Sequence, residues 1–268
     1  MEKIQATVGI LTFNSGNTLA RALESVQNFA DIVICDGGSA DDTLDIAASF
    51  GARVITQDRN FQNGNGVLRD YAGVRNQCLD TAVFDWFLYI DSDEQATPEL
   101  VAEICRITEQ REPVFLVYNV SPRIVLDGVR IQHSSNYPGW QNRFFNKRSG
   151  ARFRKAVHER IDYDKAEYPA GFLKGHWLYF ISNNQDGVKN RKYAYMDATH
   201  HATKKSSVFL VLVGKRLIVL LKAVLKILYN RVRYGNKANL PLVLEFTRVQ
   251  YHIYFLQALA RHFFNRTS

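Results

Sequence analysis

Residues 87–94 read Phe-Leu-Tyr-Ile-Asp-Ser-Asp-Glu, an apolar run that ends in three carboxylates within four positions. Aromatic and β-branched side chains predict a buried strand of a parallel sheet, because such strands are covered on both faces. Open α/β sheets bind their ligands beyond the carboxyl ends of the strands. The three acids therefore indicate a divalent-cation or nucleotide site. A capping turn before Pro98 explains one acid but hardly all three.

Three strand-to-helix units precede this stretch. Residues 6–13, 32–35 and 53–56 are short apolar runs, and each leads into a polar loop. Helical patterns follow at 18–29, from 44 onward and at 67–79. In the first of them the apolar positions share one face: Leu19, Ala22, Leu23 and Val26. The alternation predicts an α/β fold, Rossmann-like, with a mostly parallel sheet and helices on both faces.

The pattern changes after a predicted helix from Pro98 to about Gln110. Residues 114–120 and 123–132 alternate around Asp127-Gly128, which predicts a β-hairpin. Residues 137–145 mix aromatic rings with polar groups, as a wall that contacts sugars does. Residues 184–203 look helical and basic.

The 268 residues, 46% of them apolar, can bury a sizeable core. The net charge of +8 is uneven, since residues 1–188 carry 19 basic and 24 acidic side chains, whereas residues 189–268 carry 15 and 2. We expect a catalytic domain over 1–203, with a donor half (1–112) and an acceptor half (113–203). Residues 204–268 form an appended basic helical region.

The three cysteines, Cys35, Cys78 and Cys105, lie in apolar patterns without metal-ligand spacing. They indicate reduced core residues in a cytoplasmic setting. The N-terminal residues run straight into a strand, so we expect no secretory signal.

Residues 207–229 are long enough to span a bilayer but contain four cations, which makes spanning doubtful. Lys215, Lys222 and Lys226 cluster on one helical side and leave a broad Leu/Val/Ile face. We interpret this as an amphipathic helix lying on an anionic membrane surface, at the cytoplasmic face of the cell membrane. A core-packing helix with its lysines in water is the alternative. A last helix is expected over 241–264.

Four motifs together resemble those of family 2 glycosyltransferases of the GT-A type. They are Thr12-Phe13-Asn14, Asp36-Gly-Gly-Ser-Ala-Asp-Asp-Thr43, Arg75-Asn76 and Asp91-Ser92-Asp93. Later segments at 137–145, 152–153 and 157–159, together with the basic tail, further resemble the subgroup containing lipopolysaccharide core β-1,4-glucosyltransferases. The resemblance implies inverting transfer of a hexose from a nucleotide sugar, with a UDP-sugar favoured, to a lipid-linked saccharide acceptor.

The resemblance also implies roles on the donor side. The implied donor contacts are Thr12, Asn14, Asp36, Arg75, Asp91 and Ser92, with Arg69 as an alternative to Arg75. Asp36 is expected at the base, Asp91 at the ribose and Arg75 at the pyrophosphate. Asp36 could instead merely start the Gly37-Gly38 turn.

Mg²⁺ or Mn²⁺ is the expected cofactor, with Asp93 as its ligand. His176 is a second candidate ligand, although it could equally be an ordinary core or surface histidine. Glu159 is the preferred general base. Because the usual Glu-Asp pair of the family is missing, His158, Asp93 and Glu94 stay open as alternatives. Acceptor contacts are expected from Trp140, Gln141, Arg143 and His158.

Two other functions compete with this interpretation. A sugar nucleotidyltransferase uses a similar sheet and acids, but its Gly-rich, Lys/Arg-bearing loop after the first strand is missing here. The basic tail suggests a nucleic-acid-binding protein. Its cations, however, alternate with Leu and Val rather than with rings that stack on bases, so we expect no nucleic acid partner.

Overall fold

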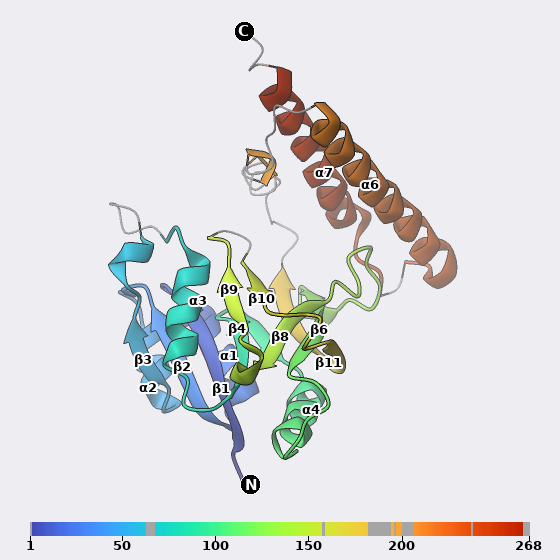
Figure 1. Ribbon diagram of the computed structural model, residues 1–268. Coiled ribbons are helices and arrows are strands. Elements are labelled where there is room, and N and C mark those ends of the chain that lie inside the picture. The colour runs from blue at the N-terminus through green and yellow to red at the C-terminus, as the bar shows by residue number, and fades with distance from the viewer. Residues whose placement is uncertain are drawn as a thin grey trace. The chain divides into compact units, whose positions relative to one another are not determined.

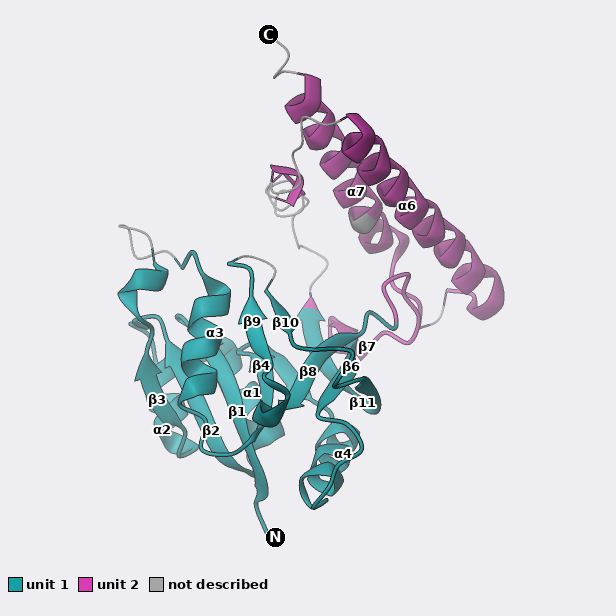
Figure 2. Ribbon diagram, in the orientation of Figure 1, with its two compact units in different colours: residues 1–123, 138–180 teal, residues 124–137, 181–268 magenta. Residues whose placement is uncertain are grey.

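The computed structural model describes residues 2–62, 68–156, 159–181, 194–195, 197–199, 206–236 and 238–264. The chain divides into two compact units, shown in Figure 2. Unit 1 comprises residues 1–123 and 138–180. Unit 2 comprises residues 124–137 and 181–268.

Four parallel strands form the N-terminal half of the central sheet in unit 1 (Figure 1). They are β1 (Ile4–Thr12), β2 (Phe29–Asp36), β3 (Arg53–Thr56) and β4 (Trp86–Asp91), in the order β3-β2-β1-β4. The predicted parallel α/β sheet is thereby confirmed. Thr12 pairs with Asp36 and Leu11 with Asp91, so the polar residues after three strands share one edge.

Strands from the second half of the chain continue this sheet in the order β8-β6-β11-β5. Their bounds are Gln141–Asn146 for β8, Val117–Leu126 for β6, Ala170–Ile181 for β11 and Glu94–Ala96 for β5. β8 lies antiparallel to both β4 and β6, and β11 is antiparallel to β5. A separate ribbon pairs β9 (Arg152–Arg154) with β10 (Arg160–Asp162).

The predicted hairpin forms around Asp127-Gly128, where β6 pairs with β7 (Val129–Arg130). Both turn residues have positive φ, 46° and 82°, as a tight hairpin turn requires. One difference is that β6 runs unbroken through residues 120–123, where two separate strands were expected.

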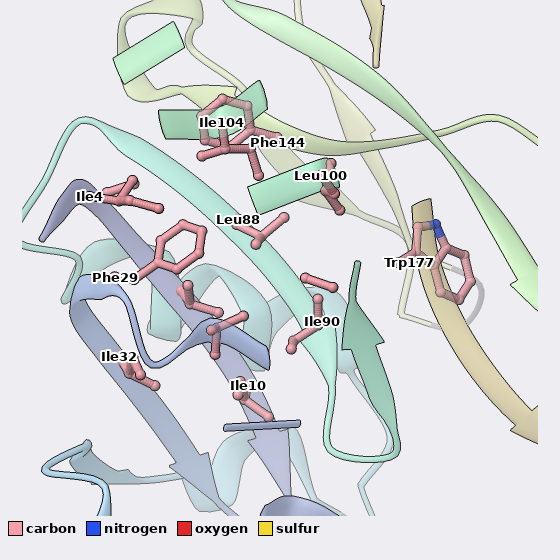
Figure 3. Packing of buried hydrophobic residues seen from close by; sticks show 14 of the residues in the cluster. Ile4, Ile10, Phe29, Ile32, Leu88, Ile90, Leu100, Ile104, Phe144 and Trp177 are labelled. Atoms are coloured by element: carbon pink, nitrogen blue, oxygen red, sulfur yellow. The ribbon is translucent and has the colours of Figure 1, made fainter. Parts of the chain in front are cut away.

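Helices cover both faces of the sheet, as predicted. They are α1 (Gly16–Val26), α2 (Thr43–Ser49), α3 (Tyr71–Asp80) and α4 (Pro98–Thr108), with 3₁₀ turns at Arg59–Phe61 and Lys147–Ser149. α1 and α4 pack on the face that carries Ile10, Leu88 and Ile90 (Figure 3). α3 packs on the opposite face against Phe87 and Tyr89. The buried side of α1 consists of the four residues predicted from periodicity.

Two local features bear on the start of the helices α3 and α4. α3 begins at Tyr71, where the Asp70 side chain caps it by accepting a hydrogen bond from the Gly73 N–H, so Arg69 precedes the helix. After Asp91 the chain turns and forms β5, and the helix that follows is capped by Thr97 with Pro98 at its first position. Neither Ser92 nor Asp93 is therefore a helix cap.

Unit 2 contains the helices α6 (Ser206–Tyr234) and α7 (Leu242–Phe264). They pack through a small cluster in which Phe255 and Leu259 are buried against Phe209 and Leu212. Most of the helix predicted over 184–203 lies outside the described residues. Across the described part of the chain, every helix is too short or too polar to cross a bilayer.

The cysteines are free thiols, as expected, with Cys35 and Cys78 buried and Cys105 partly so. Burial raises the pKa of the Cys35 thiol to about 12. These thiols are therefore core residues with little thiolate character.

We predict that Gly175→Ala destabilises unit 1 by about 1–3 kcal/mol, the usual range for overpacking. A Cβ at this position of β11 would lie 2.3 Å from the backbone N and Cα of Leu100 in α4, and backbone atoms cannot move aside as a side chain can. All three tryptophans (Trp86, Trp140 and Trp177) lie in unit 1, so their fluorescence during urea unfolding reports on it.

Gly214→Ala is the matched control, because this α6 glycine of unit 2 has open space around its Cβ position. That variant should leave the tryptophan transition unchanged. If the urea midpoint of Gly175→Ala equals that of the wild type, α4 and β11 can move apart at little cost in stability.

Candidate active site

The carboxyl edge of β1, β2 and β4 gathers the polar residues that the sequence placed after these strands. The Asp36 carboxylate is 4% exposed and accepts four hydrogen bonds. The donors are the hydroxyls of Thr12 and Ser39 and the N–H groups of Gly38 and Ser39, at 2.6–2.9 Å. Burial alone would raise the pKa of Asp36, but these bonds outweigh it and lower the pKa. Asp36 thus orders the loop after β2, and a base contact would have to replace one of these bonds.

Asn14 ties the loop after β1 to the loop after β2. Its φ of 49° is left-handed, its N–H donates to the Ser39 hydroxyl at 2.8 Å, and its side-chain oxygen accepts from the Ala40 N–H at 2.9 Å. The two loops are therefore held together by their own hydrogen bonds. The neighbouring Phe13 is 61% exposed at this edge. Sequence reasoning assigned Phe13 no role, although an aromatic residue directly after a buried strand was a usable signal.

Arg75 of α3 lies between two carboxylates. Its Nη2 is 2.5 Å from Asp91 Oδ1, at the end of β4, and its Nε is 2.6 Å from Glu159 Oε1, just before β10. Partial burial alone would raise the pKa of Asp91, but the charge of Arg75 outweighs it and lowers the pKa. The sequence placed Arg75 at the pyrophosphate. In the structure, its Nε and Nη2 groups instead donate to the carboxylates of Glu159 and Asp91.

Arg143, which was expected to contact the acceptor, is buried. Its guanidinium pairs with Glu94 at 2.8 and 3.2 Å and stacks on the rings of Trp177 and Tyr89, at 3.9 and 4.6 Å from their centroids. Burial raises the pKa of Glu94 to about 7, although Arg143 opposes the rise. Arg143 and Glu94 therefore brace the floor beneath the site. The strand pattern around Arg143 gave no indication that Glu94 would be its partner.

Asp93 lies beside this network and makes no direct ion pair among the described residues, although the charges of Arg21 and Arg143 act on its carboxyl. Its backbone carbonyl accepts from Arg21 at 3.3 Å, while reduced hydration and the nearby charge of Asp91 raise the pKa of its carboxyl. The Ser92 hydroxyl is 3.0 Å from that of Ser15. These positions leave Asp93 as the acid of the motif that would gain most from a bound cation.

The expected metal site has no preformed protein cage. His176 Nδ1 lies 3.2 Å from the Ser121 carbonyl, and the described residues contain no group of three or more His, Cys, Asp or Glu placed to hold an ion. Charge nevertheless fits a divalent cation, because the Asp93 carboxylate is in no ion pair among the described residues, and Asp91 and Glu159 share the single guanidinium of Arg75. Mg²⁺ is commonly held by one or two carboxylates plus substrate phosphates and waters. Asp93 suits that mode of binding.

Of the residues expected to contact the acceptor, the structure describes Trp140, Gln141 and Arg143. Trp140 is half-exposed, and its ring meets the exposed Phe172 of β11 edge-on at 5.0 Å between centroids. Gln141 is exposed and accepts from Arg143 Nε at 3.2 Å. Arg69 is exposed ahead of α3. His158 lies outside the described residues, and Phe172 is a candidate that sequence reasoning missed.

Curated relatives resemble part of this chain. A Rickettsia felis protein named an uncharacterized glycosyltransferase is 35% identical over 122 residues, which are 45% of this chain and 39% of that protein. The Bacillus subtilis glycosyltransferase SunS is 23% identical over 188 residues, 69% of this chain and 42% of that one. The matched stretches thus span about two fifths of these relatives.

Solved structures resemble it more distantly. S. aureus TarS 1–349 in complex with UDP has 13% identity and a TM-score of 0.48, with 100% of this chain and 92% of that chain covered. Glucosyl-3-phosphoglycerate synthase from Mycobacterium tuberculosis, in complex with Mn²⁺, UDP and glucosyl-3-phosphoglycerate, has 20% identity and a TM-score of 0.31, with 46% and 44% covered.

The sequence model described as Glycosyl transferase family 2 matches residues 7–166, well over half of the chain. That stretch includes most of β1, all of β2 to β4 and the acidic motifs after β2 and β4, together with Arg75 and Glu159. The chain belongs to glycosyl transferase family 2.

Proposed function

We propose that this enzyme transfers a hexose, with inversion, from a nucleotide sugar to a lipid-linked saccharide during synthesis of a bacterial cell-surface polysaccharide such as lipopolysaccharide. A UDP-sugar is the donor to test first. One observation carries the proposal: Asp91 and Glu159 meet at Arg75 beside Asp93, at the carboxyl edge of the parallel strands. Acids from the donor-side motif and from the later segment thus meet at one place.

We place the donor pocket at the loops after β1 and β2, which are held together by hydrogen bonds. We place the base against the exposed ring of Phe13, because aromatic rings stack on nucleobases with little sequence preference. Thr12, Asn14 and the Asp36 loop shape this pocket through their mutual hydrogen bonds. The ribose then lies toward Asp91 and Ser92, and the diphosphate toward Asp93.

Asp93 would hold Mg²⁺ or Mn²⁺, with His176 as a possible second ligand. A bound divalent cation neutralises charge on the departing diphosphate. The protein contributes the Asp93 carboxylate and the surplus negative charge of Asp91 and Glu159 around Arg75, which favour such a cation.

Glu159 is the proposed base. Its carboxylate takes the proton of the acceptor hydroxyl, the hydroxyl oxygen bonds to the anomeric carbon, and the bond from that carbon to the diphosphate oxygen breaks. Attack from the face opposite the leaving group inverts the centre. Trp140 and Phe172 offer an exposed aromatic surface for the acceptor sugar.

The surface of α6 supports contact with an anionic membrane. Its outward residues are largely apolar, with Leu210, Leu221, Leu225 and Leu228 each more than half exposed. Three lysines lie along the same helix, and unit 2 has few acids to oppose them. A helix with this composition binds at the interface by burying apolar area and attracting acidic lipid. We therefore place the enzyme on the cytoplasmic face of the cell membrane.

We predict that EDTA abolishes transfer and that Asp93→Asn does the same, because the ligand for the cation would be lost. Calorimetry of UDP binding with and without Mn²⁺ checks the cause. In the wild type Mn²⁺ should tighten UDP binding, whereas in Asp93→Asn it should have little effect. Full turnover in EDTA would rule out metal dependence.

We predict that Glu159→Gln lowers kcat by about 10² to 10⁴, the usual contribution of a general base, because the amide keeps the shape but cannot accept the proton. UDP affinity should stay within about threefold, since the base acts on the acceptor. Glu112→Gln, at an exposed glutamate, is the control and should have full activity. A loss below about threefold in Glu159→Gln would assign the base elsewhere.

We predict that Leu221→Glu combined with Leu225→Glu weakens binding to vesicles that contain phosphatidylglycerol by at least about tenfold, since both exposed side chains would otherwise enter the interface. Flotation measures this directly, with pure phosphatidylcholine vesicles for comparison. Leu44→Glu, on the exposed side of α2 in unit 1, is the control. Equal flotation of all three proteins would contradict the membrane assignment.

A further inference from the structure

Arg75 has unusual surroundings for a residue expected to bind a diphosphate. It is 5% exposed, and its guanidinium joins Asp91 at 2.5 Å to Glu159 at 2.6 Å. Two carboxylates on one guanidinium leave the trio with a net negative charge. Such a trio repels a diphosphate rather than attracting it.

The plane of this guanidinium is fixed from the sides as well. Its central carbon lies 4.7 Å from the centroid of the Tyr89 ring and 5.9 Å from that of Phe153. Turning the Arg75 side chain toward a ligand would separate both ion pairs, and leaving this buried guanidinium without its partners is strongly unfavourable. The two rings therefore hold the arginine in the orientation that serves its two carboxylates.

Asp91 is anchored independently of Arg75. Its backbone N–H donates to Glu94 Oε2 at 2.9 Å, and Glu94 is in turn paired with the buried Arg143. Asp91 is thus held in place by Glu94 and Arg143. Arg75 in turn links Asp91 to Glu159.

The neighbouring residue of α3 holds the same ribbon. Asn76 donates to the Phe153 carbonyl and accepts from the Phe153 N–H, both at 2.9 Å, and β9 pairs with β10 directly after Glu159. Consecutive residues of one helix therefore hold the segment that carries the proposed base. Asn76 fixes its backbone, and Arg75 fixes the carboxylate.

We infer that Arg75 is a positioning residue: it orients Glu159 relative to the Asp91 motif and does not bind the diphosphate. This rests on the proposed function, in which Glu159 is the base. The arrangement links the donor-side loop to the base, so that the attacking hydroxyl and the anomeric carbon meet in a fixed geometry.

The test compares Arg75→Lys and Arg75→Met with Glu159→Gln and with the double variant Arg75→Met/Glu159→Gln. If Arg75 acts through Glu159, kcat of Arg75→Met falls about as far as that of Glu159→Gln, and the double variant loses little more. UDP affinity, measured by calorimetry with Mn²⁺, stays within about threefold. Lysine can pair with only one carboxylate at a time, so Arg75→Lys should recover only part of the rate.

Hydrogen exchange supplies a measurement that needs no turnover. In Arg75→Met, peptides covering 159–162 should exchange faster by at least about tenfold, while those of β1 stay protected. Arg152→Lys is the matched control, since Arg152 lies in the adjacent ribbon and pairs with Asp80 in an exposed ion pair. Arg152→Lys should match the wild type in kcat, in UDP affinity and in hydrogen exchange at 159–162.

A fall in UDP affinity of more than about tenfold in Arg75→Lys, with kcat preserved, would overturn the inference and return Arg75 to the diphosphate. Unchanged exchange at 159–162 would overturn it as well. If Arg75→Met does not fold, Arg75→Lys alone decides, through its UDP affinity relative to kcat and through hydrogen exchange at 159–162. A wild type inactive with every nucleotide sugar would refute the proposed function, whereas the exchange result would still decide whether Arg75 holds Glu159.

Discussion

Two buried arginines lie against one tyrosine ring, and the site depends on the carboxylates that pair with them. Arg75 and Arg143 approach the Tyr89 ring at 4.7 and 4.6 Å, and each takes its carboxylate partners from other segments of the chain. A buried guanidinium without such a partner is costly. The end of β4, the start of β5, β8 and the Glu159 segment are therefore held in one arrangement, and the acids of the sheet edge are fixed with them.

Much of the framework was predictable because it follows from periodicity. β1, β2 and β4 are mainly runs of apolar side chains, and the buried face of α1 repeats at helical spacing. Parallel strands also place their carboxyl ends together, which is why Asp36 and Asp91 could be assigned to one edge before the structure was known. Family motifs in the same positions then made the enzyme class recognisable.

The pairing of charged residues could not be predicted in this way. Glu94 and Arg143 are 49 residues apart, and Arg75 and Glu159 are 84 apart, so only tertiary structure brings them together. Sequence patterns treat an arginine near a ligand site as a ligand contact. Burial in the structure assigns Arg143 to the floor instead and surrounds Arg75 with carboxylates. Three of the four hydrogen bonds to Asp36, by contrast, come from Gly38 and Ser39 in the local turn that the sequence had offered as an alternative, and the bond from Thr12 requires the neighbouring strand.

The hydrogen bonds between the loops after β1 and β2 bear on the kinetics of donor capture. Asn14, Ser39 and Ala40 fix these loops in the protein without a ligand, so their conformational entropy is already lost on folding. A preorganised pocket of this kind binds with little rearrangement, and its association rate reflects diffusion and orientation rather than loop closure. Under the proposed function, discrimination between donors would then reside in dissociation rates, set by how well each base and sugar fits these fixed loops.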